Sequence, residues 1–284
     1  MKNRPIPQQI ELDGSTRQQM LYDHAITLLR QLEPPKGYYL STSFGKDSIA
    51  AHRLCDEAGV RYDAHHNITG IDPPELVYFG RKHYPGVLRH RPSMSMWKLI
   101  ERKGILPLRQ RRFCCEVLKE DGGMGRVCVM GIRAEESSRR RDAWAPVATR
   151  GDKGNEVRIF DNDDIQTSLQ RCMVRDKLVV NPIYHWTSSD LWAFIKDRKM
   201  PYCNLYDEGF ERLGCIGCPM TREKKRRREL ERWPGFYQLY MRAIQKLIDK
   251  GRFQDKGSAQ DVMDWWLSDK EQLPPIDGQV SLGD

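Results

Sequence analysis

Strand-like and helix-like patterns of apolar residues alternate along much of the chain. Short apolar or alternating stretches are typical of strands, and apolar residues spaced three and four positions apart are typical of helices. The expected strands are residues 38–40, 61–68, 87–89, 127–132 and 178–183, and the expected helices are residues 15–32, 48–54, 75–83, 94–102 and 188–195. This alternation predicts an α/β fold with a doubly wound, mainly parallel sheet that binds its ligand at the carboxyl ends of the strands.

The pattern fails between Ala134 and Asp176, where polar residues and short charged runs show little periodicity. We interpret this stretch as a mobile insertion within a first domain that spans residues 1–198. Residues 199–284 begin with a cysteine-containing loop and continue with helix-like sequence. They are therefore expected to form a helical C-terminal region.

Residues 38–48 join a strand to a helix through small and polar residues that suit anion binding. A tight turn directs several backbone N–H groups to one point, and the positive end of the helix dipole adds to their effect. Gly45 lets a ligand approach the backbone, Lys46 supplies a cation, and Asp47 can cap the helix or hold Mg²⁺. The stretch predicts a phosphate site, with an ordinary capped helix as the alternative.

Charge and cysteine content narrow the class of protein. The net charge of +8 suits polyanions such as nucleotides, nucleic acid or an acidic partner. No apolar run approaches the ~20 residues of a membrane span, and the N-terminus lacks the apolar stretch of a secretory signal. We therefore expect a soluble, cytoplasmic protein without a membrane partner. In such a protein the eight cysteines favour metal or redox chemistry over a disulfide framework.

Two pairs of cysteines together offer four thiolates: Cys114 with Cys115, and Cys215 with Cys218. A C-x-x-C turn places two sulfur atoms on one ion or cluster, and an adjacent pair can supply two more. Adjacent cysteines are unusual in structural zinc sites. The pattern therefore favours a [4Fe–4S] cluster, with zinc or no metal as the alternatives.

The remaining cysteines are Cys55, Cys128, Cys172 and Cys203. Cys128 lies in an apolar strand and is expected in the core. Cys203 is close enough in the chain to the C-x-x-C turn to be an alternative ligand. Cys172 lies between Arg171 and Arg175, which would lower its thiol pKa, so it is a candidate sulfur carrier.

Several basic residues are candidates for binding phosphate groups. Arg133 follows the most apolar strand, where a parallel sheet binds its ligand, and a guanidinium can bind phosphate with two parallel hydrogen bonds. The arginines of the run Arg139–Arg141 can also bind phosphate groups, or they can be exposed to solvent without binding a ligand. The block Lys224–Arg228 can follow a nucleic-acid backbone, but it is equally typical of a solvated helix surface or a partner site.

The motif Ser43-Phe44-Gly45-Lys46-Asp47-Ser48 resembles the pyrophosphate loop, Ser-x-Gly-x-Asp-Ser, of the N-type ATP pyrophosphatases. It does not fit the Walker A loop, which has a longer glycine spacing. The resemblance implies an adenine nucleotide α-hydrolase-like fold and cleavage of ATP to AMP and pyrophosphate with Mg²⁺. It also implies that these six residues bind the nucleotide and that Lys46 and Asp47 are catalytic. Arg133, which follows the most apolar strand, is the third residue expected to be catalytic.

A second resemblance, over residues 38–220, is to the sulfonucleotide reductases. It rests on the cysteine pattern, on Gly131–Ser137 and on Asn181-Pro182-Ile183. It implies that Gly131, Arg133 and Glu136 bind the nucleotide and that the ligands of the cluster are Cys114, Cys115, Cys215 and Cys218. The chain departs from these reductases because it keeps Asp47 in the loop and has no cysteine after Cys218 to match their C-terminal nucleophile.

A reductase-like body that keeps an ATP-cleaving loop resembles the ATP pyrophosphatases of bacterial DNA phosphorothioation systems (the Dnd and Ssp types). That resemblance implies adenylylation of an acceptor for sulfur transfer, with a separate cysteine desulfurase as the sulfur donor. The expected acceptor is a nucleic acid, with DNA favoured over tRNA. A homo-oligomer is a possible assembly of the chain. The alternatives are a sulfonucleotide (PAPS or APS) reductase, a tRNA thiolation enzyme, and a non-enzymatic nucleic-acid-binding iron–sulfur protein.

Overall fold

The computed structural model describes residues 16–119, 122–136, 141, 146–150 and 177–269. The chain divides into two units that alternate along the sequence. Unit 1 consists of Met1–His66, Glu75–His90 and Gly122–Arg212, and unit 2 consists of Asn67–Pro74, Arg91–Asp121 and Leu213–Asp284.

Within the described residues, the strands form one six-stranded sheet in the order β3-β2-β1-β4-β6-β5. Their bounds are β1 Tyr38–Ser41, β2 Tyr62–Asn67, β3 Leu88–His90, β4 Val127–Val129, β5 Val147–Arg150 and β6 Lys177–Val180. β1 runs parallel to β2 and β4, β4 runs parallel to β6, and β5 runs antiparallel to β6. The strand order reverses between β1 and β4, which is the switch point where doubly wound sheets bind ligands. The predicted mainly parallel α/β fold is confirmed.

Apolar residues in register across the central strands form the core of this sheet. Leu40 in β1 lies opposite Val129 in β4, and Val129 lies opposite Val180 in β6. None of these three side chains is exposed, so each contributes its full apolar area to burial. Cys128 is buried with Tyr39 and Val179 in a cluster of its own, which confirms its expected place in the core.

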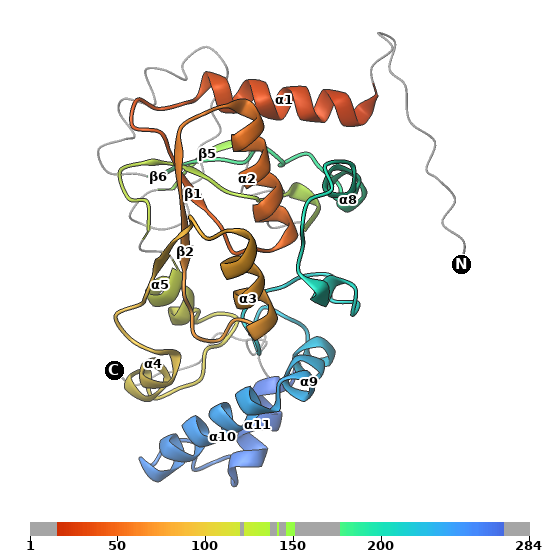
Figure 1. Ribbon diagram of the computed structural model, residues 1–284. Helices are drawn as coiled ribbons and strands as arrows, with labels where there is room; N and C mark the ends of the chain where they lie inside the picture. The colour runs from red at the N-terminus through yellow and green to blue at the C-terminus, as the bar shows by residue number, and fades with distance from the viewer. Residues whose placement is uncertain (1–15, 120–121, 137–140, 142–145, 151–176, 270–284) are drawn as a thin grey trace, which may run out of the picture. The chain divides into compact units, whose positions relative to one another are not determined.

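The helices in the described part of unit 1 are α1 (Arg17–Gln31), α2 (Lys46–Ala58), α3 (Pro74–His83) and α8 (Ser188–Asp197), with short 3₁₀ turns at η1 (Ala134–Glu136) and η2 (Asn204–Tyr206). α1 packs on α2, and α2 packs on α8 (Figure 1). The Thr187 hydroxyl and the Asp190 carboxylate form a capping box that begins α8. α2 follows β1 directly, so its N-terminus lies at the carboxyl end of a central strand.

Unit 2 is helical within its described residues and contains α4 (Met96–Lys103), α5 (Phe113–Lys119), α9 (Glu223–Arg232), α10 (Pro234–Asp249) and α11 (Ala259–Leu267). α10 packs against α4, α9 and α11. The Tyr240 hydroxyl donates to the Ile216 carbonyl oxygen at 3.0 Å, and the Trp266 indole donates to the Pro107 carbonyl oxygen at 2.9 Å. The expected helical, cysteine-containing C-terminal region is confirmed. Because unit 2 also includes two earlier stretches, the domain boundary after residue 198 stays a prediction.

Some elements differ from the sequence pattern. β5 lies inside the stretch 134–176 that its polarity predicted to be a mobile insertion, because pairing with β6 stabilises four residues that show no strong apolar pattern. Most of the rest of that stretch lies outside the described residues. α5 is too short to show a helical repeat in the sequence, and β4 ends at Val129 rather than at the predicted residue 132. No helix in the described part of the chain is long and apolar enough to cross a membrane.

Candidate functional site

The turn between β1 and α2 holds three backbone N–H groups on hydroxyl oxygens. The Ser48 hydroxyl accepts from the N–H of Ser43 at 3.2 Å, and the Thr42 hydroxyl accepts from the N–H of Phe44 at 3.2 Å. The Tyr206 hydroxyl accepts from the N–H of Lys46 at 2.8 Å, at the first position of α2. A turn whose N–H groups bind oxygen atoms at the start of a helix is suited to the oxygen atoms of a phosphate.

Phe44 gives this turn its shape. Its φ of 60° lies in the left-handed region, which is uncommon for a residue with a large side chain. The buried ring lies 4.5 Å from the ring of His66, measured between centroids, and against Gly80 in α3. A Cβ atom at residue 80 would be 2.5 Å from two ring carbons of Phe44, so only glycine leaves room for the ring. The packing of the ring therefore holds the strained backbone of the turn.

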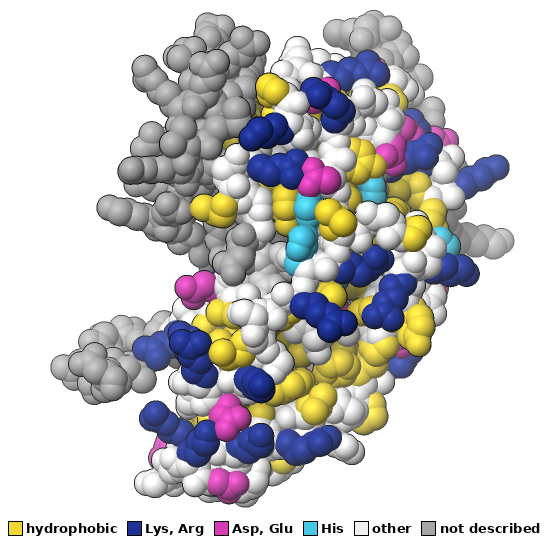
Figure 2. Space-filling view, turned by 60° about the vertical axis from the view of Figure 1, so that its left-hand side comes forward, with side chains coloured by type: hydrophobic (Ala, Val, Ile, Leu, Met, Phe, Trp, Pro, Cys, Tyr) yellow, Lys and Arg dark blue, Asp and Glu magenta, His cyan; other side chains and the backbone are white. Residues whose placement is uncertain are grey.

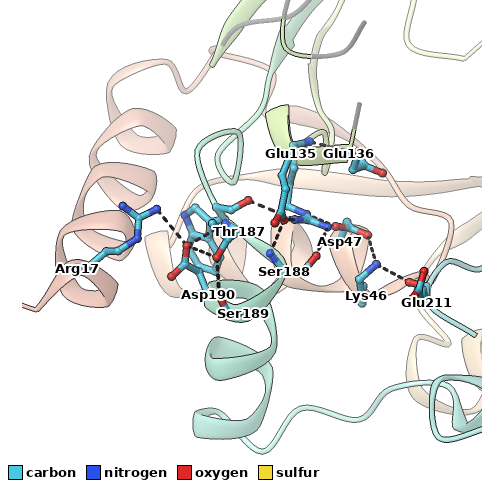
Figure 3. Close-up of polar contacts among 12 residues, drawn as sticks. Arg17, Lys46, Asp47, Glu135, Glu136, Thr187, Ser188, Ser189, Asp190 and Glu211 are labelled. Carbon is cyan, nitrogen blue, oxygen red and sulfur yellow. Dashed lines mark hydrogen bonds and ion pairs between the residues drawn. The ribbon is translucent and has the colours of Figure 1, made fainter. Parts of the chain in front are cut away.

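Lys46 and Arg133 share the carboxylate of Asp47. The Lys46 ammonium lies 3.3 Å from Oδ2 of Asp47 and donates to the Glu211 carbonyl oxygen at 2.9 Å (Figure 3). Nε of Arg133 donates to Oδ1 of Asp47 at 2.5 Å. Lys46 is 6% exposed and Arg133 is 2% exposed, so both charges are held in a desolvated site. Such a pair can bind a multiply charged anion strongly, because little solvent screens the interaction.

Glu135 and α8 hold Arg133 in place. Nη1 of Arg133 donates to Oε2 of Glu135 at 2.7 Å, and Nη2 lies 3.3 Å from the Ser188 hydroxyl. Burial by itself would lower the pKa of Arg133, but the carboxylates of Asp47 and Glu135 outweigh it and raise that pKa. Burial would likewise raise the pKa of Glu135, but hydrogen bonds from Arg133 and the Ser188 N–H lower it overall. Arg133 is therefore a permanent, oriented cation.

The structure brings the residues of the predicted nucleotide site together. Gly131 lies against the backbone of Asp47, and the carboxylate of Glu136 accepts from the N–H of Arg133 at 3.3 Å. The carbonyl oxygen of Arg141 accepts from the hydroxyl of Tyr184 at 2.9 Å. Arg139 and Arg140 lie outside the described residues. The assignment of these residues to ATP stays a prediction.

Sequence reasoning missed four residues of this site: Gly80, Glu135, Ser188 and Tyr206. Tyr206 is 160 positions from Lys46 in the chain, so no local spacing links the two. Glu135 falls within the motif Gly131–Ser137, but the resemblance that the motif carries implies no role for it. A carboxylate two residues after a candidate phosphate-binding arginine is the one signal that would have suggested a positioning residue.

The four predicted ligand cysteines all lie in unit 2. Cys114 and Cys115 are in α5, and Cys215 and Cys218 flank a tight turn in which the N–H of Cys218 donates to the Cys215 carbonyl oxygen at 3.2 Å. Gly217 makes this turn with a φ of 72°, a conformation that glycine adopts without strain.

The four thiols act on one another electrostatically. A hydrogen bond with Cys115 and then burial raise the pKa of Cys114, and Cys215 and Cys218 are close enough to raise it further. Burial raises the pKa of Cys215 to about 11, although the neighbouring Lys119 ammonium opposes the shift. A cation bound among these sulfur atoms would reverse the shifts and favour the thiolates. Among the residues that the structure describes, no three His, Cys, Asp or Glu side chains converge as the ligands of one metal ion do.

The other cysteines are placed separately. Cys203 is buried in unit 1 just before η2, and its thiol lies 3.8 Å from the side-chain oxygen of Asn204. Cys55 is buried in α2. Cys172, the candidate sulfur carrier, lies outside the described residues.

The basic block Lys224–Arg228 is divided between the core and the surface of unit 2. Arg226 is 0% exposed, donates to the Trp266 carbonyl oxygen at 2.7 Å, and lies over the Trp266 ring at 4.2 Å. Arg227 pairs with Glu223 and Asp264. Lys224 and Arg228 are exposed. Lys and Arg side chains are spread over the face in Figure 2, with fewer Asp and Glu side chains between them.

Two curated relatives have sequence similarity to much of the chain. An uncharacterised protein of Methanocaldococcus jannaschii is 25% identical over 228 residues, which are 76% of this chain and 43% of the relative. An adenosine 5′-phosphosulfate reductase of Oceanobacillus iheyensis is 28% identical over 160 residues, which are 54% of this chain and 57% of the relative. The chain thus spans about half the length of these curated relatives.

Solved structures with a related arrangement have low sequence identity. A phosphoadenylyl-sulfate reductase of Candida auris, solved as a phosphate complex, gives a TM-score of 0.48 at 14% identity, with 74% of this chain and 98% of that chain covered. The FMN adenylyltransferase of Candida glabrata, in complex with FAD and inorganic pyrophosphate, gives a TM-score of 0.46 at 14% identity, with 71% and 63% covered.

One protein family covers more than half of the chain. The phosphoadenosine phosphosulfate reductase domain matches residues 37–221. That span contains the turn before α2, Arg133 and both cysteine pairs. The chain belongs to the phosphoadenosine phosphosulfate reductase domain family.

Proposed function

We propose that the chain is an ATP pyrophosphatase that adenylylates an acceptor for sulfur transfer, as in DNA phosphorothioation of the Dnd or Ssp type. The observation that carries this proposal is the position of the Asp47 carboxylate between Lys46 and Arg133. Two cations beside a phosphate-binding turn suit a pyrophosphate leaving group. When pyrophosphate takes the two cations, the Asp47 carboxylate is released and can ligate the Mg²⁺ that accompanies ATP.

In the proposed reaction an oxygen atom of the acceptor attacks the α-phosphorus of ATP. The bond from that phosphorus to the oxygen that bridges to the β-phosphate breaks, and pyrophosphate leaves with its electron pair. Lys46, Arg133 and the N–H groups of the turn stabilise the charge that develops on pyrophosphate. A sulfur nucleophile then displaces AMP from the acceptor, because AMP is a better leaving group than the original oxygen.

The cysteines of unit 2 fit an iron–sulfur cluster by the chemistry of their donor atoms. Cys114, Cys115, Cys215 and Cys218 supply four sulfur atoms from a helix and a tight turn, and they lie within electrostatic range of one another. Each iron of a [4Fe–4S] cluster takes its own thiolate, so four sulfur atoms need not converge on one point. When bound, such a cluster supplies redox chemistry for the sulfur that is transferred.

The proposed partners are a nucleic-acid acceptor and a separate cysteine desulfurase. Lys224 and Arg228 lie four residues apart on α9, both exposed, and are suited to contact phosphate groups or an acidic partner surface. Arg226 and Arg227 do not contribute to that surface in the same way, because they pack and pair within unit 2. DNA is the proposed acceptor before tRNA.

ATP labelled at the α-phosphate tests the first step. The expected products are AMP and pyrophosphate, and formation of ADP and orthophosphate would contradict the assignment. The second step needs reconstitution with a cysteine desulfurase, cysteine, ATP and either DNA or tRNA, followed by nuclease digestion and mass spectrometry. Phosphorothioate-linked dinucleotides are expected from DNA, whereas thiolated nucleosides would assign the protein to tRNA.

A sulfonucleotide reductase is the second candidate, because a similar curated protein is named as an adenosine 5′-phosphosulfate reductase. It predicts release of sulfite from adenylylsulfate or its 3′-phosphorylated form in the presence of a thiol reductant. Sulfite release without cleavage of ATP would favour this candidate over the proposed one.

A further inference from the structure

Tyr206 differs from the other two hydroxyl groups that hold the turn before α2. Thr42 and Ser48 belong to the turn and to its helix, so they remain there whatever binds. Tyr206 comes from η2, 160 positions further along the chain, and places its hydroxyl oxygen 2.8 Å from the backbone nitrogen of Lys46. A Cβ atom on Gly45 would be 3.4 Å from the same oxygen, so the hydroxyl fills the space next to the glycine.

The same short segment also holds the side chain of Lys46. The Glu211 carbonyl oxygen accepts from the Lys46 ammonium at 2.9 Å, and the ammonium lies 5.6 Å from the centre of the Tyr206 ring. Residues 206–211 therefore bind both the backbone N–H and the ammonium of one residue. These are the two groups of Lys46 that an anion at the start of α2 would use.

Tyr206 offers a weaker acceptor than a phosphate oxygen. Burial raises the pKa of Tyr206, so its hydroxyl stays neutral at physiological pH. A charged oxygen accepts hydrogen bonds that are roughly twice as strong as those of a neutral one. A phosphate group that replaces the hydroxyl at Lys46 therefore binds with a favourable free energy. That free energy is smaller by the free energy of the Tyr206 contact that is lost.

The exchange requires rotation of the Tyr206 side chain, whose ring packs among other aromatic rings. Residues 207–209 are exposed. Leu205 and Phe210, on either side of Tyr206 and this exposed stretch, are buried and fix the segment to unit 1. The Tyr206 ring meets Trp192 edge-on, with centroids 5.2 Å apart, and contacts Tyr202 at 6.4 Å. Edge-on aromatic contacts of this size contribute about 1 kcal/mol, which a rotating ring can exchange for similar contacts.

We propose that the Tyr206 hydroxyl is a placeholder for a phosphate oxygen. When pyrophosphate binds, its oxygen atoms replace the Tyr206 hydroxyl at the backbone N–H of Lys46 and replace the Glu211 carbonyl oxygen at the Lys46 ammonium. This inference rests on the phosphate-binding part of the proposed function. Tyr206 thus occupies the place of an anion at the N–H of Lys46 when no ligand is present, and it lowers the affinity of the turn for anions.

Calorimetric titration with inorganic pyrophosphate and Mg²⁺ tests the inference on the wild-type chain, Tyr206→Phe and Tyr202→Phe. Tyr206→Phe keeps the ring and removes the competing hydroxyl. The dissociation constant for pyrophosphate should therefore fall about fivefold, a change that corresponds to the net free energy of one ordinary hydrogen bond. Tyr202→Phe is the matched control, because its hydroxyl pairs with Asp207 and not with the turn. It should bind as the wild type does.

Each outcome decides a separate point. Equal or weaker binding by Tyr206→Phe, with the wild type binding pyrophosphate, overturns the placeholder and leaves the phosphate site in place. If neither protein binds pyrophosphate, the phosphate site itself fails and the placeholder fails with it. Hydrogen exchange gives an independent readout: pyrophosphate should slow exchange in residues 43–49 and speed it in residues 204–212. Slower exchange in both segments would instead make Tyr206 a ligand contact and overturn the inference.

Discussion

Gly131 lies against the backbone of Asp47 with no space between them for a side chain. A Cβ atom on Gly131 would be 2.6 Å from the Asp47 carbonyl oxygen and 2.7 Å from the carbonyl carbon. Two residues later, Arg133 reaches the Asp47 carboxylate. The bare backbone at residue 131 therefore sets how closely the segment after β4, which carries the arginine, approaches the helix that carries the aspartate.

Gly131→Ala should separate Arg133 from Asp47. The methyl group would push the segment that follows β4 away from the first turn of α2, because its neighbour is backbone and cannot move aside. We expect ATP cleavage to fall at least about tenfold, since small displacements of catalytic groups have effects of that size or larger. Gly235→Ala is the control, because a Cβ atom there meets no atom within 4 Å. Equal activity of both variants would contradict the role of Gly131.

Asp47→Asn should separate catalysis from binding. The variant cannot ligate Mg²⁺ with a carboxylate, so we expect the rate of ATP cleavage to fall by about 10²–10³. It also leaves the charges of Lys46 and Arg133 without their shared counter-ion. Pyrophosphate without Mg²⁺ should therefore bind at least as tightly as to the wild type. Rapid-quench kinetics and calorimetry measure the two effects, and weaker binding of metal-free pyrophosphate would argue against the shared-carboxylate arrangement.

Gly80→Ala should disturb the turn through Phe44. The added methyl group overlaps the Phe44 ring, which His66 and Tyr84 already confine. Moving the ring releases the left-handed backbone at Phe44, so we expect pyrophosphate affinity to fall about tenfold, or ~1.4 kcal/mol. Gly86→Ala is the control, because it is the same substitution at a position where a Cβ atom meets no atom within 4 Å. Should both variants bind pyrophosphate like the wild type, Phe44 does not hold the turn.

The parts of the site that the sequence predicted are those encoded in one short stretch or at the end of a strand. Ser43–Ser48 lie together in the chain, and Arg133 follows the most apolar strand, so local pattern and sheet topology locate both. Tyr206 and Gly80 reach the turn from other elements, at sequence separations that no periodicity records. Their contribution depends on tertiary packing, which a single sequence does not display.

Arg226 shows why composition alone misplaces residues. Five consecutive basic residues predict a charged surface or a binding site, yet the helical repeat turns one of them into the core. There its guanidinium donates hydrogen bonds to carbonyl oxygens at the end of α11 and packs over the ring of Trp266. Those acceptors come from residues about 40 positions later, so the sequence of α9 gives no sign of them. The exposed positions of the block, Lys224 and Arg228, follow the same repeat.

Cys215→Ser and Cys218→Ser should each lower the iron and sulfide content of protein purified without oxygen. Loss of one thiolate leaves an iron atom without its protein ligand, and the metal no longer connects the turn to α5. Elemental analysis and the broad absorption near ~400 nm measure the loss. Cys55→Ala is the control, because this thiol is buried in α2 of unit 1. Unchanged iron in both serine variants would remove the cluster from the proposed function.

Glu229 should make unit 2 less stable as the pH rises. Burial raises its pKa to about 7, although the Gly217 N–H donates to its carboxylate at 3.0 Å. The unfolded chain has the lower, ordinary pKa, so between about pH 4.5 and 7 the folded state binds more protons and loses stability with increasing pH. Glu229→Gln removes that titration and keeps an acceptor for the N–H.

Thermal unfolding at pH 5.5 and pH 8 measures this effect. The melting temperature of Glu229→Gln relative to the wild type should be higher at pH 8 than at pH 5.5. Glu223→Gln is the control on the same helix, because Glu223 pairs with Arg227 at its surface. A difference between Glu229→Gln and the wild type that is the same at both pH values would mean that Glu229 does not titrate in this range.

The division of unit 2 among three stretches of chain has a consequence during synthesis on the ribosome. α4 buries Met96, Leu99 and Ile100, and it packs against α10, which begins only at Pro234. At the usual speed of ~5–20 residues per second, α4 leaves the ribosome roughly ten seconds before α10 exists. For that time α10 is not there to cover the apolar face of α4, so we expect chaperones to bind the nascent chain. Fragments that end before residue 213 lack α10 altogether, and we expect them to aggregate.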